Sequence, residues 1–455
     1  MTHLKHLTTA ACAALALAAA PAAQAGTITY EGDTLVLVAS PGEANFVTFG
    51  AEQEGRLSIS DSGAVHGYPA DRCSRLDADY PIQCDAPARV RADFGDGDDT
   101  VVVDHMVAAG TQVDIAAGPG RDNVKAVGDN TKLTVDGGAG ADRLRSEGGG
   151  DVLRGGPDAD QLEGNGGADV LEGEDGDDRL TGDACGPPAA DVLDGGAGYD
   201  VLTDWGQCGP ALDPRPVTVT VNGKADDGRP GEGDDVRDLD SLELYVPATV
   251  QGTDDAESVA IYAPAGAGPS TIDGRGGPDD LRAGSGRETI LGGSGDDRIE
   301  GGFGNDALTG GPGRDEIHGD STAAQCGGSG QSCTIPFGND VIDARDGEAD
   351  QVDCGPGEDR ATVDALDTVA ADCEHVERRG HSAGPGSPGA APDSPARTCT
   401  VPRVVGLRVR AAKRRIARAG CLPVLRGRGR RVARQSVKAG RQLPAGSTVR
   451  LTRGR

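Results

Sequence analysis

A nine-residue pattern, Gly-Gly-x-Gly-x-Asp-x-Leu-x, recurs in strict phase in two blocks of this 455-residue chain. Each block has an acidic residue at every ninth position and a Leu or Ile two residues after it. The acids of the first block are Asp142, Asp151, Asp160, Asp169 and Asp178, and the phase returns at Asp200 after an insertion. Those of the second block are Asp279, Glu288, Asp297, Asp306 and Asp315. So strict a period predicts a repeat architecture in which each unit packs only on its neighbours.

The residue types within the period are those expected of a calcium site. Calcium is a hard cation that takes six to eight oxygen ligands. A turn rich in glycine can direct its carbonyl groups inward, and the Asp adds a charged oxygen. The Leu or Ile lies on a strand and points to the interior. A Gly- and Asp-rich flexible segment with no site is the alternative, but apolar residues at every ninth position argue against it.

The pattern resembles the RTX family of calcium-binding nonapeptide repeats. The resemblance implies a turn of six residues and a strand of three, so that two repeats form one coil of a right-handed parallel β-roll, or β-solenoid. All eleven acids named above are then candidate Ca²⁺ ligands. Neighbouring repeats serve opposite sides of the roll, so one ion is expected to bridge acids eighteen residues apart, such as Asp142 and Asp160.

One Leu or Ile per nine residues is little apolar burial against the entropy of ordering those residues. Bound ions are therefore expected to supply much of the stabilisation. We expect the roll to be largely disordered without calcium.

The charge of the chain is divided unevenly. The net charge is -29, but residues 400–455 hold 17 Lys or Arg and no acid. The rest of the chain therefore carries 73 acids against 27 bases, a net charge of -46. An acidic body of this kind suits a protein that holds many divalent cations, and its self-repulsion would oppose compaction without them.

The N-terminus and the cysteines both indicate export. Lys5, an Ala- and Leu-rich run, and Ala23-Gln24-Ala25 before Gly26 are typical of a secretory signal peptide at 1–25. No later stretch approaches the roughly 20 apolar residues of a transmembrane helix. Without Cys12, ten cysteines remain, and sequential disulfides are favoured over zinc ligation. The expected pairs are Cys73/Cys84, Cys185/Cys208, Cys326/Cys333, Cys354/Cys373 and Cys399/Cys421.

The patterning predicts an all-β body followed by a small C-terminal domain. The predicted segments are an N-terminal β cap at 26–92, a first repeat block at 93–214, an irregular β segment with an acidic loop at 215–270, a second repeat block with a C-terminal cap at 271–377, and a Pro/Gly/Ser-rich linker at 378–397. One continuous solenoid and two separate rolls are both compatible with this order.

Residues 398–455 resemble a PASTA domain, a small α+β fold with one helix on a three-stranded sheet. The matching features are Val401-Pro402, a helical pattern from Ala411 to Ala419, and the closing segment Pro444 to Val449. The resemblance implies binding to peptidoglycan, and the positive charge favours anionic cell-wall polymers as partners. Specific nucleic-acid binding is not expected of an exported protein.

No motif predicts an enzyme. Gly380-His-Ser382-Ala-Gly384 matches G-x-S-x-G, but it lies in the predicted linker instead of between a strand and a helix. Packing near Cys208 is favoured for Tyr199 and Trp205 over a sugar-stacking role. The sequence therefore predicts a secreted, calcium-binding structural or interaction protein, extracellular or attached to the cell wall. The alternatives are an extracellular adhesin, or the accessory scaffold of a secreted hydrolase whose catalytic part lies in residues 26–115 or 215–270.

Overall fold

The structure is a computed structural model, and it describes most of the chain after residue 25. The described residues are 26–40, 42, 44–51, 56–61, 65, 67–77, 80–104, 110–128, 132–183, 189–204, 215–264, 266–320, 337–379, 398–405, 412, 416, 422–426, 431–444 and 448–454. The predicted signal peptide, the Gly380–Gly384 motif and nearly all of the predicted linker lie outside these residues.

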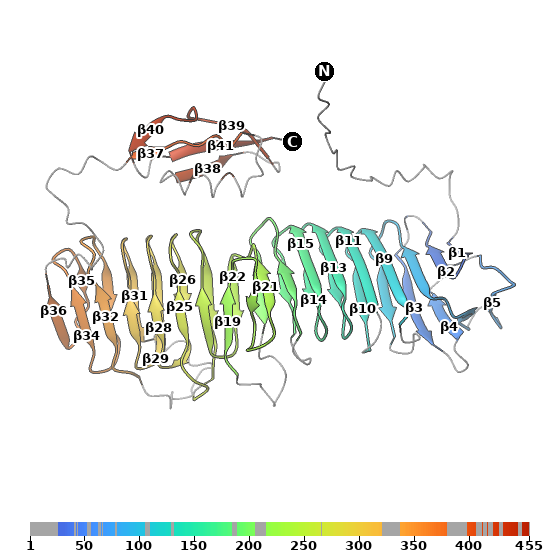
Figure 1. The fold of residues 1–455 in the computed structure, drawn as a ribbon, viewed down its shortest axis with the longest axis horizontal. Helices are drawn as coiled ribbons and strands as arrows, with labels where there is room; N and C mark the ends of the chain where they lie inside the picture. Colours follow the sequence, from blue (N-terminus) through green and yellow to red (C-terminus); the bar gives the residue numbers. More distant parts are fainter. Residues whose placement is uncertain are drawn as a thin grey trace, which may run out of the picture.

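The body is an elongated solenoid whose strands follow one another along its long axis (Figure 1). Two faces of the solenoid carry parallel ladders of strands. We call the ladder that runs the whole length sheet B, and the two that share the opposite face sheets A and C. The strands of sheet A, in spatial order, are β1 (Thr27–Glu31), β2 (Thr34–Val38), β7 (Arg89–Asp93), β9 (Gln112–Pro119), β11 (Lys132–Ala139), β13 (Val152–Pro157), β15 (Val170–Asp175), β17 (Val192–Asp194), β21 (Asp234–Arg237) and β20 (Ala225–Asp227).

Sheet B begins with antiparallel strands of the N-terminal cap and then becomes parallel. Its cap strands are β5 (Cys73–Ser74), β6 (Ile82–Asp85), β4 (Arg56–Asp61) and β3 (Phe46–Ala51). Its parallel strands are β8 (Thr100–Val103), β10 (Asn123–Ala126), β12 (Arg143–Arg145), β14 (Gln161–Glu163), β16 (Arg179–Thr181), β18 (Val201–Asp204), β22 (Ser241–Leu244), β24 (Ser258–Ile261), β26 (Asp280–Arg282), β29 (Arg298–Gly304), β31 (Glu316–Asp320), β33 (Gln351–Asp353) and β35 (Thr368–Val369), with β27 (Ser285–Gly286) beside the end of β29.

Sheet C covers the second half of the opposite face. Its strands are β19 (Val217–Thr220), β23 (Ala248–Gln251), β25 (Thr271–Asp273), β28 (Thr289–Leu291), β30 (Ala307–Thr309), β32 (Val341–Ala344), β34 (Arg360–Val363) and β36 (His375–Arg378). Because β18 pairs with β22 and β22 with β24, sheet B passes without a break through the irregular segment. The body is therefore one continuous solenoid, interrupted on one face only.

The strand register places the periodic Leu and Ile residues directly above one another. Leu144 is paired with Leu162, and Leu162 with Leu180, in consecutive coils of sheet B. In sheet C the same alignment joins Ile290 to Leu308. All of these side chains are buried in one apolar cluster that runs through the solenoid. The nonapeptide pattern thus folds as predicted, with alternate repeats on opposite faces.

Two of the predicted disulfides are present among the described residues. Cys73 is bonded to Cys84 within the N-terminal cap, and Cys354 to Cys373 near the end of the solenoid. Cys185, Cys208, Cys326, Cys333 and Cys421 lie outside the described residues, as does the side chain of Cys399. No helix within the described parts of the chain is long and apolar enough to cross a membrane.

The C-terminal residues form a separate small unit. Its strands are β37 (Thr398–Thr400) with β40 (Gln442–Pro444), and β38 (Leu422–Arg426), β41 (Thr448–Gly454) and β39 (Arg431–Gln435) in a three-stranded sheet. Ala412 and Ile416, the two described residues near the middle of the predicted helix, are helical and fully buried. They share a small apolar cluster with Val404, Val432 and Leu451.

Candidate metal centre

All eleven predicted calcium ligands are buried at the turns of the solenoid. None of these acidic residues is more than 3% exposed. Isolated carboxylates at this depth are costly unless they are paired, hydrogen-bonded or bound to a cation. Their burial therefore calls for a partner.

The acids form two ladders of side chain to backbone hydrogen bonds along the solenoid axis. In the first ladder the N–H of Asp142 donates to Asp160 Oδ1 at 2.8 Å, and the N–H of Asp160 to Asp178 Oδ1 at 2.9 Å. The same bond joins Asp178 to Asp200 at 3.0 Å. Asp279, Asp297 and Asp315 repeat the arrangement in the second block. Acids eighteen residues apart are thus neighbours, as the sequence predicts.

The second ladder serves the alternate repeats. The N–H of Asp151 donates to Asp169 Oδ1 at 2.8 Å, and the N–H of Glu288 to Asp306 Oδ1 at 2.8 Å. Each hydrogen bond uses only one carboxylate oxygen. The opposite turns of each coil therefore carry separate sets of acids.

The second carboxylate oxygen is buried without a hydrogen-bond partner at many of these positions. Among the described residues this holds for the Oδ2 atoms of Asp142, Asp160, Asp169, Asp178, Asp279, Asp297 and Asp315. A buried, unsatisfied oxygen that recurs with the period of the fold is the kind of group that an ion would satisfy.

Glycine leaves space beside these oxygens. A Cβ on Gly137 would lie 2.6 Å from Asp142 Oδ2 and 2.8 Å from the carbonyl oxygen of Gly155 in the next coil. At Gly292 the corresponding distances to Asp297 Oδ2 and the Gly310 carbonyl are 2.5 and 2.6 Å. A carboxylate oxygen and a backbone carbonyl of the following coil thus converge where the side chain is missing. Both are oxygen ligands of the type that calcium prefers.

No group of three or more His, Cys, Asp or Glu side chains that could hold a metal occurs among the described residues. A calcium ion here would therefore take its ligands from few carboxylates and from several backbone carbonyls. This composition suits glycine-rich turns better than a cage of side chains, so the residues present fit calcium.

Burial strongly raises the pKa of these carboxyl groups. It raises the pKa of Asp142 to about 7, that of Asp160 to about 6 and that of Asp178 to about 8, with hydrogen bonds from the backbone opposing the shift. In the second block the pKa of Glu288 rises to about 9 through burial and the nearby Asp306. A bound cation would favour the ionised form and offset this penalty.

The ladders extend beyond the eleven predicted residues. The N–H of Asp99 donates to Asp122 Oδ1 at 2.7 Å, and the N–H of Asp122 to Asp142 Oδ1 at 2.8 Å. Asp191 accepts from the N–H of Asp169, and burial raises its pKa to about 9. Further acids, Asp340, Asp350 and Asp359, continue the ladders toward the C-terminus. Sequence reasoning missed Asp191 although it lies nine residues before Asp200 and two before Leu193.

Comparison with known families agrees with this geometry. A family model for the RTX calcium-binding nonapeptide repeat matches residues 134–162, 154–184, 188–206, 265–290 and 291–321. A model for the PASTA domain matches residues 400–454. A search of curated proteins finds no match to the chain.

Proposed function

We propose that this chain, which carries RTX calcium-binding nonapeptide repeats and a PASTA domain, is an exported structural or interaction protein whose solenoid folds on extracellular calcium. The observation that carries the proposal is the row of buried carboxylates with a free oxygen at one coil after another. Backbone N–H groups orient the acids, and the glycines leave room for an ion beside them. The calcium supplies the positive charge that this interior lacks.

The difference in calcium concentration between the cytosol and the extracellular space supports export before folding. Extracellular calcium modules bind at about 10⁻⁴ to 10⁻³ M, a range that cytosolic calcium does not reach. The two disulfides of the solenoid also suit an oxidising compartment. Folding after export is therefore the expected order of events.

We further propose that the C-terminal unit holds the solenoid at the cell wall and that the protein is not an enzyme. The support for attachment is the match to the PASTA model together with a surface of exposed bases, among them Arg434, Lys438, Arg441 and Arg450. Anionic wall polymers would be attracted to these side chains, and the attraction would weaken with salt.

Two measurements on the full mature chain test the proposal. Calorimetric titration with calcium, followed by circular dichroism, should show binding of several ions coupled to a gain of β structure. An unchanged dichroism spectrum in chelator would contradict calcium-driven folding.

Sedimentation with purified cell walls should retain the protein, and replacing Arg434, Lys438, Arg441 and Arg450 by Gln should release much of it. Equal sedimentation of this variant and the parent protein would remove the attachment proposal.

A further inference from the structure

A groove of about 440 Å³ runs across the coils of the second half of the solenoid. Its lining begins at Tyr199, just before β18, and ends at Gln351 in β33. These strands are separated by six pairings of sheet B, or roughly 29 Å at the usual spacing of about 4.8 Å. A volume of this size spread over such a length describes a narrow channel that fits an extended chain better than a compact molecule.

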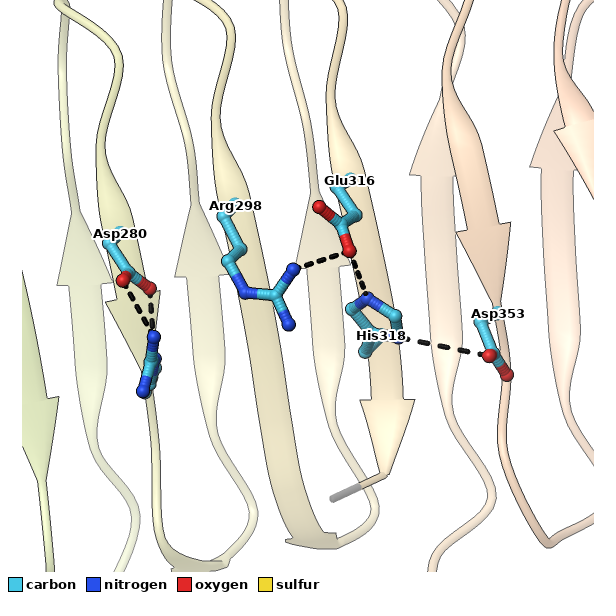
Figure 2. Close-up of polar contacts among 6 residues, drawn as sticks. Asp280, Arg298, Glu316, His318 and Asp353 are labelled. Carbon is cyan, nitrogen blue, oxygen red and sulfur yellow. Dashed lines mark hydrogen bonds and ion pairs between the residues drawn. The ribbon is translucent and has the colours of Figure 1, made fainter. Parts of the chain in front are cut away.

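One wall of the groove consists of charged side chains of both signs. Asp280, Arg298 and Glu316 stand on neighbouring strands of the outer face, and Arg298 reaches Glu316 (Figure 2). His318 contacts the same Glu316 carboxylate at 2.9 Å. The Glu316 carboxylate therefore stands beside the guanidinium group of Arg298. The wall therefore offers donors and acceptors in fixed positions.

The turns add charged residues of both signs to the lining. Asp296 and Arg314 are both exposed, and the N–H of Arg314 donates to Asp296 Oδ1 at 3.1 Å. The groove also includes Asp279, Asp297 and Asp315, three of the candidate calcium ligands, whose charge bound calcium would neutralise. On the calcium-loaded solenoid, a polymer carrying one sign of charge would then meet a like charge among Asp280, Arg298 and Glu316 on successive coils. A neutral chain with many hydroxyl groups can donate to the carboxylates and accept from the guanidinium groups.

The ring of Tyr199 provides an apolar surface at one end. It is 52% exposed, although the sequence favours a packing role for it. The backbone N–H of Tyr199 donates to Asp177 Oδ1 at 2.8 Å, which fixes the start of this turn. An exposed aromatic ring at one end of a polar groove suits a ligand that is apolar on one face and hydroxylated at its edges, as a sugar ring is.

An extended peptide fits less well. The strands beneath the groove are paired on both sides, so a peptide would find no open strand edge for backbone hydrogen bonds. The acids of the floor and walls also disfavour nucleic acid, which needs a basic surface.

We propose that this groove binds a segment of a neutral, linear polysaccharide lying along the solenoid axis, with Tyr199 stacking on a sugar ring. The inference rests on the calcium-loaded solenoid of the proposed function, but it does not depend on wall attachment through the C-terminal unit. It assigns the solenoid a ligand of its own.

The test uses the full mature chain in saturating calcium and isothermal calorimetry. The probes are β-1,4-linked hexasaccharides of glucose and of N-acetylglucosamine, the matching disaccharides, and a hexamer of galacturonic acid as the anionic chain. We expect the neutral hexasaccharides to bind more tightly than the disaccharides, because a longer chain occupies more of the groove. The anionic hexamer should bind more weakly than the neutral ones.

Substitutions locate the binding site. Tyr199→Ala should weaken hexasaccharide binding roughly tenfold, the scale of an energetically important contact residue, whereas Tyr199→Phe should keep it because the ring remains. Arg298→Ala should also weaken it. Tyr80→Ala is the matched control, since Tyr80 is an equally exposed tyrosine of the N-terminal cap and should leave binding unchanged.

Three results would overturn the proposal: no binding of either neutral hexasaccharide, equal or tighter binding of the anionic hexamer, or unchanged binding by both Tyr199→Ala and Arg298→Ala. Circular dichroism on the same samples separates these results from a failure of calcium-driven folding. A solenoid that folds with calcium and binds no glycan contradicts only the groove proposal.

Discussion

The repeat blocks and the segment between them bury apolar side chains to very different extents. In the blocks a short strand buries a single periodic residue, as β14 buries Leu162 and β28 buries Ile290. In the middle segment, residues 217–263, a strand buries two, as β24 buries Val259 and Ile261. The middle segment can therefore rely more on apolar packing, whereas the blocks depend on whatever neutralises their buried acids.

The acid ladders show the same contrast. The first ladder enters the middle segment where the N–H of Asp200 donates to Asp240, and it leaves the segment where the N–H of Glu257 donates to Asp279. The second ladder reaches Asp234 through the N–H of Asp191. In sheet C, the uncharged Oγ of Ser270 accepts the backbone N–H of Ala248. We therefore expect the repeat blocks to depend more on bound cations than the middle segment does.

Calcium removal should give the largest effect and would test this difference directly. We expect chelator to unfold the coils of residues 142–200 and 279–320, while the N-terminal cap and the middle segment keep part of their structure. Hydrogen exchange with peptide resolution measures the loss of structure in each region. Uniform loss of protection along the whole solenoid would show that the middle segment has no independent stability.

Loss of a single carboxylate charge should have the next largest effect. Asp142→Asn keeps an oxygen that can accept the N–H of Asp122 but removes the charge that would bind an ion. We expect the calcium concentration needed for folding to rise about tenfold, the low end of effects seen when metal sites are perturbed. Asp136→Asn is the control, because Asp136 is exposed in the same block. Equal calcium requirements for the two variants would exclude Asp142 as a ligand.

Apolar truncation sharpens the comparison between the two regions. Leu162→Ala and Leu244→Ala each remove a fully buried leucine and should cost about 2 to 5 kcal/mol in the calcium-loaded protein. In chelator only Leu244→Ala should lower the remaining stability, because the coil of Leu162 is expected to be unfolded already. Denaturant unfolding with and without calcium measures the stability of both variants. An effect of Leu162→Ala in chelator would contradict this expectation.

The pH dependence of the metal-free protein should be smaller but opposite in direction to that of most proteins. Burial raises the folded-state pKa of Asp178 and Asp315 to about 8, whereas the unfolded value is near 4. The folded state therefore binds more protons, and its stability is greatest below about pH 4 and declines as the pH rises toward 8. Circular dichroism in chelator should show more β structure at pH 4.5 than at pH 8. Saturating calcium should reduce this difference, and the same pH response with and without calcium would contradict the link.

Much of the fold could be predicted because the period itself encodes it. A Leu or Ile at every ninth residue, with glycines in the intervening turn, specifies strands that alternate between two faces, and the structure confirms this at Leu144 and Leu153. The same period identifies Asp142 and Asp160 as neighbours. Burial of these acids also follows from their place two residues before a core leucine, on the same side of the strand.

The continuation of the ladders through irregular spacing could not be predicted from the period. Asp122 and Asp142 are twenty residues apart, and Asp306 and Asp340 are thirty-four apart, yet each pair is joined like those eighteen apart. Parallel pairing of the flanking strands sets these contacts. Counting along the sequence therefore fails wherever a turn is longer.

The sequence by itself determined the repeated coil, the burial of its periodic leucines and the chemistry of its turns, because all three depend on residues within one or two periods. Only the tertiary structure decided that both blocks belong to one solenoid, that Asp306 and Asp340 are neighbours in a ladder, and that Tyr199 opens onto a groove. Those features depend on which strands pair across insertions, and pairing between coils is settled by backbone hydrogen bonds and packing that no local pattern contains.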